Sequence, residues 1–430
     1  MSEKIAIIGL GYVGLPLSLQ FARSGVRVLG LDIDGAKVDA IQAGRSYIHH
    51  IPASAIAEAV EERTFAASTE FSRVREVGAV IICVPTPLNK NREPDISYIL
   101  KTGESIAPHL HPGILVVLES TTYPGTTDED LRAVLEEGSG LKAGVDFHLA
   151  FSPEREDPGN PQSRVAEIPK VIGGLTPGCL ERAKALYGRA IKTLVPVSSC
   201  RAAEATKLTE NIFRGVNIAL VNELKVVYAA MGIDVWEVIN AAKTKPFGFM
   251  PFYPGPGLGG HCVPIDPFYL TWKAREYGQA TRFIELAGEI NTAMPGYVVN
   301  RVAEALNHRG KAVKGCRILI LGLAYKANVD DDRESPTYLL MEMLKQRGAA
   351  VSYHDPYVPV IKLTREHPQW AGTESVGWDA ATVGGFDLVL IATAHAKVNY
   401  QELAAWAPLI VDTRNAMAGV PCQSDQLWKA

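Results

Sequence analysis

The chain has 430 residues, of which 47% are hydrophobic and 21% are charged, and its formal net charge is −4. This composition is typical of a globular protein of roughly two to four domains, and it excludes a disordered or low-complexity chain. Acidic and basic residues are spread along the sequence, so we expect no nucleic-acid partner and no polybasic membrane segment.

The N-terminal residues and the cysteines predict a cytoplasmic protein. Met1–Lys4 and the apolar stretch after them superficially resemble a secretion signal, but glycines interrupt the stretch and no small-residue cleavage site follows. Six cysteines, at positions 83, 179, 200, 262, 316 and 422, have no paired spacing, which agrees with a reducing compartment. The histidines lack cysteine or carboxylate partners at ligand spacing, so no metal site is predicted.

The first predicted elements form a nucleotide-binding βαβ unit. A short strand from Lys4 runs into GLGYVG (Gly9–Gly14), and a helix over Leu15–Ser24 and a strand over Val26–Asp32 follow. The three glycines of such a fingerprint serve the tight turn, the approach of a pyrophosphate and the packing of the helix. Asp32 is placed to bind the adenosine ribose and favours NAD over NADP, because a carboxylate repels a 2′-phosphate.

Two further buried strands are predicted over Ala79–Val84 and Leu115–Leu118. Each ends in a turn with hydroxyl groups, Pro85-Thr86-Pro87 after the first and Glu119–Gly125 after the second. Because ligands of open α/β sheets bind beyond the carboxyl ends of the strands, we expect these turns to face the cofactor. Simple turns with capping hydroxyls are the alternative interpretation.

A long uninterrupted helix is predicted from Ala202 to about Met231, where Gly232 ends it. One stripe of this helix is largely polar and the rest is apolar. Such a stripe is either a solvated edge or the wall of a site. Its members lie at helical spacing: Lys207, Asn211, Arg214, Ile218 and Asn222.

Cys262 lies in a glycine-lined loop, Gly255–Pro267, that leads into another predicted helix. Glycines let a backbone approach a ligand closely, and Asp266-Pro267 is typical of an N-cap followed by the first helical residue. A cysteine just before a helix N-terminus lies where a thiolate is favoured. The alternative is a small buried packing residue, which describes most free cysteines.

The last third repeats the strand and helix order of the first. Strands are predicted at Arg317–Leu323, Ala350–Asp355, Asp387–Ala392 and Leu409–Asp412, and a helix at Ser335–Arg347. The glycine fingerprint is reduced to Gly322-Leu323-Ala324, so this half is expected to hold a nucleotide that is not a dinucleotide. The predicted fold class is α/β, with two Rossmann-like doubly wound lobes joined by a central helical segment. The predicted domains are 1–200 (NAD binding), 201–312 (helical) and 313–430 (nucleotide binding).

Taken together, these motifs resemble the UDP-glucose/GDP-mannose dehydrogenase family over nearly the whole chain. The resemblance implies oxidation of the C6 alcohol of a nucleotide sugar to a carboxylate by two NAD+, without release of the aldehyde. Cys262 would trap the aldehyde as a thiohemiacetal, and the second hydride transfer would give a thioester that water hydrolyses. The residues that carry the resemblance are Gly9–Gly14, Ser152–Arg155, Lys207–Asn211, Gly259–Cys262 with Asp266, and Lys326 with Asp332–Ser335.

The resemblance also implies that domain 201–312 carries the dimerisation surface and the catalytic loop, and that domain 313–430 binds the UDP-sugar. It implies roles for the catalytic residues as well. Lys207 and Asn211 would stabilise the developing oxyanion, and Asp266 would orient or deprotonate the water and the C6 hydroxyl. Glu154 would assist hydrolysis of the thioester. The alternatives are a plain N-cap for Asp266 and a salt bridge with Arg155 for Glu154. The predicted catalytic set is Cys262, Lys207, Asp266, Asn211, Glu154 and Thr122, with Thr121 as an alternative to Thr122.

The predicted binding residues follow from the fingerprint and the resemblance. By resemblance, Lys326 reaches the substrate, Arg333 reaches toward NAD and Arg414 contacts the uridine diphosphate, although each could be a solvated surface charge. The cofactor-binding set is Gly9, Gly11, Tyr12, Val13, Gly14, Asp32, Lys37, Pro85, Thr86, Thr121 and Arg333. The substrate-binding set is Glu154, Arg155, Lys207, Asn211, Arg214, Tyr253, Gly257, Gly259, Lys326 and Arg414.

Departures from the glucose-oxidising members favour a different sugar. Those members usually carry a lysine where this chain has Ile265 and a small residue where it has His261. The aromatic residues on both sides of Cys262 look like the bacterial branch that acts on UDP-N-acetylhexosamines for polysaccharide synthesis. UDP-N-acetylglucosamine is therefore the first choice of substrate. UDP-glucose, UDP-N-acetylmannosamine and UDP-N-acetylgalactosamine are the alternatives, because a pocket discriminates between sugars by shape.

Two rival functions and an assembly state complete the expectations. A single-step hydroxyacid-type dehydrogenase would share the N-terminal fingerprint but would not need Cys262 or a second lobe. A binding module that has lost catalysis is disfavoured by the intact Cys262, Lys207, Asp266 and Glu154. Pairing through the central helices, as in the family, implies a homodimer or a higher homo-oligomer.

Overall fold

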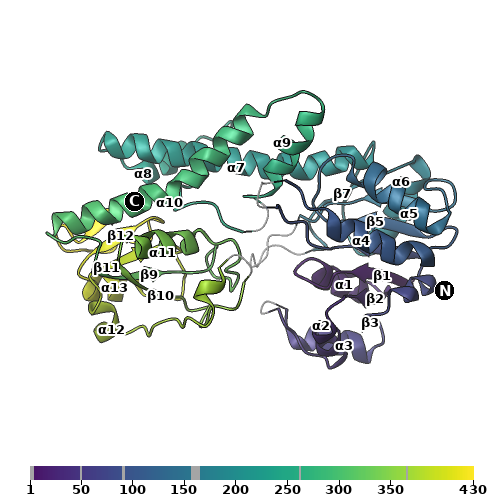
Figure 1. Cartoon of the computed structure of the whole chain (residues 1–430), viewed down its shortest axis with the longest axis horizontal. Helices are drawn as coiled ribbons and strands as arrows, with labels where there is room; N and C mark the ends of the chain where they lie inside the picture. Colours follow the sequence, from purple (N-terminus) through teal and green to yellow (C-terminus); the bar gives the residue numbers. More distant parts are fainter. Residues whose placement is uncertain (1–3, 49–50, 90–92, 156–164, 261–262, 365–366) are drawn as a thin grey trace. The chain divides into compact units, whose positions relative to one another are not determined.

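The computed structural model describes residues 4–48, 51–89, 93–155, 165–260, 263–364 and 367–430. By its internal contacts the chain forms two compact units, Met1–Asn211 with Ile265–Ala280, and Ile212–Pro264 with Thr281–Ala430. Each unit contains one largely parallel β-sheet, and the long helix α7 (Cys200–Ala230) contributes residues to both units (Figure 1). The predicted α/β fold class is confirmed, whereas the boundaries near residues 200 and 312 stay a prediction.

The sheet of the first unit has the strand order β3-β2-β1-β4-β5-β6-β7-β8 among the described residues. Strands β6 and β7 pair antiparallel, and the other neighbours pair parallel. The order reverses on the two sides of β1, which is where ligands bind in open α/β sheets. The strands are β1 (Lys4–Ile8), β2 (Arg27–Leu31), β3 (Phe65–Ser68), β4 (Ala79–Ile82), β5 (Leu115–Leu118), β6 (His148–Phe151), β7 (Lys170–Gly174) and β8 (Leu194–Val197).

Helices cover both faces of this sheet, which explains why its central strands are almost wholly apolar. Ile5 and Ile7 of β1 face one core, and Ala6 and Ile8 face the other, because successive side chains of a strand point to opposite faces. The first core is closed by α1 (Gly14–Arg23), α2 (Gly35–Gln42), α3 (Ala53–Glu61) and α6 (Pro177–Tyr187). The second core is closed by α4 (Ser97–Ile106), α5 (Arg132–Ser139) and the short helices η1 (Phe71–Glu76), η2 (Ala107–His109) and η3 (Thr126–Leu131).

The second unit repeats this design on a smaller scale, with the all-parallel order β10-β9-β11-β12-β13. Helices α10 and α11 pack on one face of the sheet, and α12 and α13 pack on the other. The strands are β9 (Arg317–Leu321), β10 (Ala350–His354), β11 (Leu388–Ile391), β12 (Ile410–Asp412) and β13 (Leu427–Lys429). The helices are α8 (Val235–Ala242), α10 (Arg282–His308), α11 (Pro336–Gln346), η4 (Pro368–Trp370), α12 (Ala380–Gly384) and α13 (Tyr400–Trp406).

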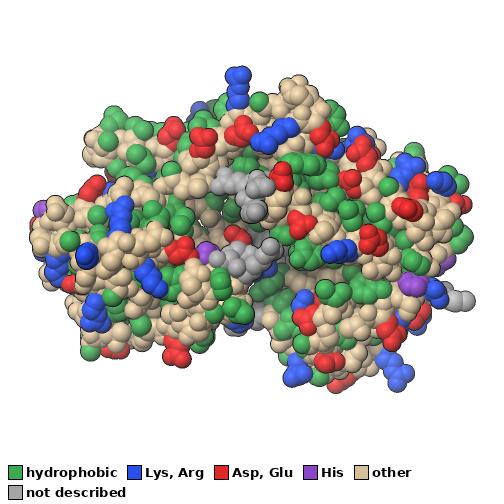
Figure 2. All heavy atoms as spheres, viewed as in Figure 1, with side chains coloured by type: hydrophobic (Ala, Val, Ile, Leu, Met, Phe, Trp, Pro, Cys, Tyr) green, Lys and Arg blue, Asp and Glu red, His purple; other side chains and the backbone are tan. Residues whose placement is uncertain are grey.

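The predicted strands and helices all appear in the structure, with ends that differ by a residue or two. Strands β3, β6, β7, β8 and β13 were not identified from the sequence. Strand β8 illustrates the reason, because it contains Pro196 and its side chains are only partly buried or exposed, so it lacks the apolar run that marks a buried strand. Acidic and basic side chains intermingle on the face of the molecule shown in Figure 2, in keeping with the small net charge.

Candidate active site

The glycine fingerprint forms a loop that fits a pyrophosphate. Gly9 has a φ of 89°, and a Cβ there would lie 2.5 Å from the carbonyl oxygen of Cys83. A Cβ on Gly14 would lie 1.9 Å from the carbonyl oxygen of Gly9, so the start of α1 packs directly on the turn. A Cβ on Gly11 would meet nothing within 4 Å, which leaves open space at the position that faces the phosphates in this motif. Tyr12 and Val13 are partly buried beside it.

Asp32 is buried at the end of β2 and still has room for one more hydrogen bond. Its carboxylate accepts from the amides of Leu10 (2.8 Å) and Asp34 (2.9 Å) and from the ammonium of Lys37 (3.2 Å). These donors fill three of about four lone-pair positions, which leaves one for a ribose hydroxyl. The next residue, Ile33, is 83% exposed and offers an apolar surface beside that position. Sequence reasoning missed Ile33, although an apolar residue just after the ribose acid was a readable signal.

The turns after β4 and β5 lie at the same edge of the sheet, because β4 pairs parallel with both β1 and β5. Pro85 is exposed and Thr86 is partly buried, and the Thr86 carbonyl accepts a hydrogen bond from the hydroxyl of Tyr269 at 2.6 Å. Thr121 is partly buried. Thr122 is fully buried, and its hydroxyl contacts that of Thr126.

A buried carboxylate, amide and lysine come together within the first unit. Asp266 and Asn211 are each 4% exposed, and the side-chain amide of Asn211 donates to the carboxylate of Asp266. Burial raises the pKa of Asp266 to about 7, although the positive charge of Lys207 and the Asn211 hydrogen bond both lower it. A carboxylate that gains and loses its proton near neutral pH is suited to general base catalysis.

The helix that carries this carboxylate corrects one of the alternatives. Helix α9 (Asp266–Glu276) begins at Asp266, its N-cap is Ile265, and no side chain caps it. The interpretation of Asp266 as a plain N-cap is therefore wrong. The Asp266 carboxylate is buried with the start of α9 and hydrogen-bonds to Asn211 on α7, because a buried charge needs a specific partner.

Glu154 belongs to a second buried network of the first unit. The ammonium of Lys170 lies 3.2 Å from the Glu154 carboxylate and 2.7 Å from that of Glu119. Burial lowers the pKa of Lys170, but the two carboxylates raise it by more, so this lysine stays protonated. The guanidinium of Arg155 pairs with Glu210 at 2.6 Å. Sequence reasoning missed Lys170, and the available signal was a lysine at the head of an apolar strand.

The loop before α9 shows why glycines occupy it. Cys262 and His261 lie outside the described residues, so the predicted nucleophile is not placed. Gly257 has a φ of 147°, and a Cβ on Gly259 would lie 2.7 Å from the Tyr325 side chain. Tyr253 stacks on Trp236 at 5.2 Å, and its hydroxyl donates to Asn240 at 2.9 Å.

The predicted ligand-binding residues of the second unit differ in their burial and in their partners. The guanidinium of Arg414 donates to the Ala392 carbonyl at 2.8 Å and lies against Gly255, where a Cβ would be 2.5 Å from it. Arg333 forms a two-pronged pair with Asp331, with distances of 2.8 and 2.7 Å. Lys326 is partly buried in the loop after β9, and Arg214 is exposed on α7.

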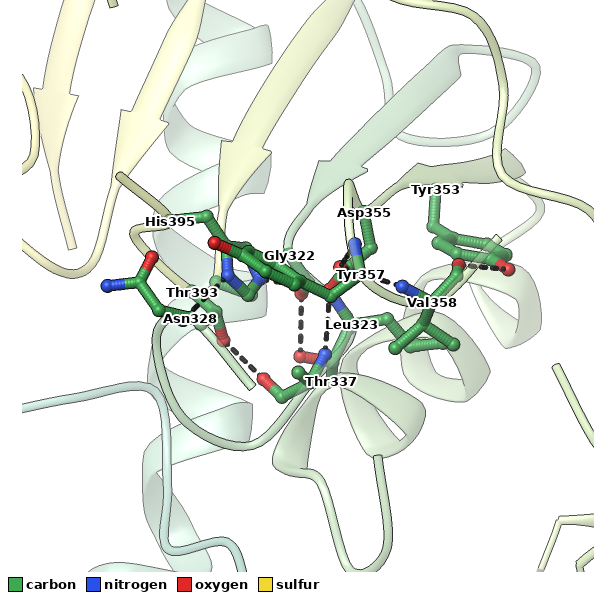
Figure 3. A network of polar contacts seen from close by, with 12 residues as sticks. Gly322, Leu323, Asn328, Thr337, Tyr353, Asp355, Tyr357, Val358, Thr393 and His395 are labelled. Carbon is green, nitrogen blue, oxygen red and sulfur yellow. Dashed lines mark hydrogen bonds and ion pairs between the residues drawn. The ribbon is translucent and has the colours of Figure 1, made fainter. Parts of the chain in front are cut away.

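The acid that follows β10, Asp355, distinguishes the second sheet from the first. Gly322 repeats the geometry of Gly9, with a φ of 90°, but the lone pairs of Asp355 are all used. Although burial opposes it, the hydrogen bond from His395 holds the pKa of Asp355 below its ordinary value. Figure 3 shows this network around Asp355. Asp355 has no lone pair left for a ribose hydroxyl, whereas Asp32 has one. The five donors, at 2.7 to 3.1 Å, are the amides of Leu323, Ala324, Tyr357 and Val358 and Nε2 of His395.

Comparison with known proteins agrees with this geometry. Models of the UDP-glucose/GDP-mannose dehydrogenase family match the chain in three parts, namely the NAD binding domain at residues 3–191, the central domain at 201–293 and the UDP binding domain at 319–419. The chain is 37% identical to the UDP-N-acetyl-D-glucosamine 6-dehydrogenase of Pseudomonas aeruginosa, over 92% of this chain and 91% of that protein.

Two further relatives are named for other sugars. An NDP-N-acetyl-D-galactosaminuronic acid dehydrogenase of Ralstonia nicotianae is 35% identical over 96% of both chains. The solved structure of a UDP-D-ManNAc dehydrogenase from Pyrococcus horikoshii matches with a TM-score of 0.89 and 32% identity, covering 99% of this chain and 98% of that one.

Within the described residues, no helix is both long enough and apolar enough to cross a membrane. The fingerprint at Gly9–Gly14, with Asp32 beside it, agrees with the NAD-binding domain that the family comparison identifies. The chain belongs to the UDP-glucose/GDP-mannose dehydrogenase family and is an NAD-dependent nucleotide-sugar dehydrogenase.

Proposed function

We propose that the protein oxidises UDP-N-acetylglucosamine at C6 to UDP-N-acetylglucosaminuronate. The observation that carries the chemistry is the buried Asp266, which hydrogen-bonds to Asn211 and lies in the field of Lys207. This arrangement provides a base with a pKa near neutral next to a cation, which is what oxidation of an alcohol through an alkoxide requires.

In the proposed mechanism, NAD+ would be held by the Gly9–Gly14 loop and Asp32, and it would supply the hydride acceptor for both oxidations at C6. Asp266 accepts the proton of the C6 hydroxyl, while Lys207 and Asn211 stabilise the negative oxygen that develops. The Cys262 thiolate then adds to the aldehyde carbon, and loss of the second hydride gives a thioester. Water, assisted by Glu154, attacks the thioester carbon and the carbon–sulfur bond breaks, which releases the carboxylate and restores the Cys262 thiolate. The two protons of the water pass to Glu154 and to solvent.

The sugar assignment rests on similarity and on two departures from the glucose-oxidising pattern. The Pseudomonas aeruginosa relative acts on UDP-N-acetylglucosamine by its name, and it is similar over 92% of this chain. Ile265, which is 8% exposed, replaces the lysine of glucose-oxidising members, and His261 replaces their small residue. UDP-N-acetylmannosamine and UDP-N-acetylgalactosamine are the alternatives that the other two relatives favour, and UDP-glucose is the alternative from the wider family.

The test is NAD+ reduction at 340 nm with each of the four UDP-sugars, with NADH counted per sugar consumed. We expect two NADH per sugar consumed, with UDP-N-acetylglucosamine as the preferred substrate. One NADH per sugar would contradict the double oxidation and favour a single-step dehydrogenase, and tight binding without turnover would favour a binding module. Cys262→Ser should abolish formation of the acid, so near-normal acid production by this variant would refute the thioester step.

We further propose a homodimer or a higher homo-oligomer that forms through α7. Phe213, Leu220 and Val227 repeat every seven residues and are 49%, 50% and 47% exposed, so they form an apolar stripe along one side of the helix. The double variant Leu220→Asp/Val227→Asp should reduce the mass in light scattering, and an unchanged mass would place the interface elsewhere.

We also propose domain boundaries near residues 200 and 312, and a cytoplasmic location.

A further inference from the structure

Lys225, in the second-unit part of α7, is a buried lysine that the proposed reaction does not use. It is 5% exposed, and its ammonium has no hydrogen-bond partner within the described residues. The nearest aromatic contact is the ring of Tyr297 on α10, whose centre lies 5.8 Å from Nζ. Burying a charged group without a hydrogen bond is strongly unfavourable, so an unpartnered buried ammonium calls for a physical reason.

The side chains around Lys225 connect it to Arg414. Asn222, three residues earlier on the same helix, accepts a hydrogen bond from the Gly255 amide at 3.0 Å and donates to Asn291 at 2.9 Å. The guanidinium of Arg414 packs against the same Gly255. Residues three apart lie on one face of a helix, so the Lys225 ammonium belongs to the face of α7 that meets this glycine loop.

The charges near Lys225 are mostly positive. Arg414 and, more weakly, Arg301 of α10 repel the ammonium, and Asp412 attracts it. The Asp412 carboxylate already accepts from the amides of Arg414 (2.8 Å) and Met417 (2.9 Å). Burial, and then Arg414, lower the pKa of Lys225 to about 7. Within the described residues, the Lys225 ammonium hydrogen-bonds neither to Asp412 nor to any other acceptor.

The turn after β12 contains a second polar atom without a partner. Asn415 follows Arg414 with a left-handed φ of 56°, and its buried Oδ1 has no hydrogen-bond partner within the described residues. Two polar groups near Arg414 therefore lack a hydrogen-bond partner. The donor is the Lys225 ammonium, which Arg414 repels, and the acceptor is Oδ1 of Asn415, the next residue in the chain. This pattern is typical of a built site for a polar ligand rather than of a packed core.

We propose that Lys225 is a nucleotide-binding residue whose ammonium, together with Arg414, donates a hydrogen bond to an oxygen of the bound UDP moiety. The acceptor is a phosphate oxygen or a uracil carbonyl oxygen. Either one would accept the hydrogen bond that the Lys225 ammonium does not make within the described residues. The proposal rests on the proposed UDP-sugar substrate, and it adds a residue outside the motifs that identify the family.

Binding should be coupled to proton uptake. An acceptor oxygen at Nζ favours the charged amine, so the ligand raises the pKa of Lys225 above its value in the free protein. Around and above neutral pH a fraction of the free protein holds a neutral amine, and that fraction takes up a proton when the ligand binds. Affinity should therefore be highest below pH of about 7 and should fall as pH rises through the pKa of the free protein.

The test is calorimetric titration of the full-length protein with UDP-N-acetylglucosamine, in the absence of NAD+, between about pH 6 and pH 8.5. This ligand has no group of its own that titrates in that range. Lys225→Met keeps the apolar stem and removes the charge, and it should fold at least as stably because it removes an unpaired buried ammonium. At pH 6 its affinity should be about 10- to 100-fold weaker than that of the wild type, and the pH dependence should be lost.

The controls separate the possible outcomes. Lys345→Met, at an exposed lysine of the same unit, should bind like the wild type. Titration with uridine identifies the acceptor, because uridine binding responds to Lys225→Met only if the oxygen belongs to the base. The same titration is repeated with UDP-glucose, which carries the same nucleotide. An effect of Lys225→Met on UDP-glucose binding would support the role of Lys225 even if the proposed sugar is wrong. Wild-type affinity and wild-type pH dependence in folded Lys225→Met would overturn the proposal.

Discussion

Asp266→Asn should raise stability while it removes activity. Burial raises the pKa of Asp266 from 3.8 to about 7, which corresponds to ~4 kcal/mol of unfavourable free energy for the ionised form. Because the pKa in the folded state is the higher one, the folded chain binds more protons than the unfolded chain between these two values. Stability therefore falls as pH rises from about 4 to about 7, and the full penalty is present above about pH 7.

An asparagine at position 266 keeps an oxygen that accepts from Asn211 but carries no charge. The variant should lose about 10²- to 10⁴-fold in kcat, which is the typical contribution of a general base. At saturating substrate, the kcat of the wild type should rise with pH through about 7 as Asp266 loses its proton. In the variant this limb should disappear.

The assay is chemical denaturation of both proteins at pH 5 and pH 8, together with pH profiles of NADH formation. At pH 8 the variant should be more stable than the wild type by up to ~4 kcal/mol, with a smaller gain at pH 5. Asp425→Asn, at an exposed aspartate, is the control and should change neither quantity. A variant of near-normal kcat, or one whose stability follows pH as the wild type does, would refute the assignment of Asp266 as a buried base.

Three further predictions address the first unit. Asp32→Ala should weaken NAD binding at least tenfold, by about 1.4 kcal/mol or more, without changing UDP-sugar affinity, and an unchanged NAD affinity in calorimetry would remove this carboxylate from the ribose site. Gly11→Ala should fold but bind NAD weakly, whereas Gly14→Ala should fail to fold, because its Cβ would lie 1.9 Å from a carbonyl oxygen; equal thermal stability of the two variants would contradict the assigned packing. Lys170→Met should destabilise the protein by about 3 to 5 kcal/mol in denaturation experiments, because it leaves the buried carboxylate of Glu119 without its cation, and a stability loss below about 1 kcal/mol would show that the pair contributes little.

The polar stripe of α7 shows how far sequence patterns reach. Helical spacing placed Lys207, Asn211 and Asn222 on one face, but it left open whether that face was solvated or lined a site. The structure buries Asn211 and Asn222 but exposes Arg214, so only part of the stripe faces the interior. Lys225 lies 18 residues after Lys207, which is five turns of a helix, so the same spacing was a readable signal for it. Only the tertiary structure shows that its ammonium is buried without a partner.

The sequence by itself determined the features that depend on local chemistry. The first βαβ unit, the glycine turn at Gly9 and the acid at Asp32 follow from spacing and backbone sterics, which neighbours in the chain decide. The tertiary structure alone decided which partners the site carboxylates meet. Glu154 meets Lys170, and Asp266 meets Asn211 in place of its own helix end, through contacts between segments far apart in the chain. Burial and charge depend on those contacts, and no local pattern encodes them.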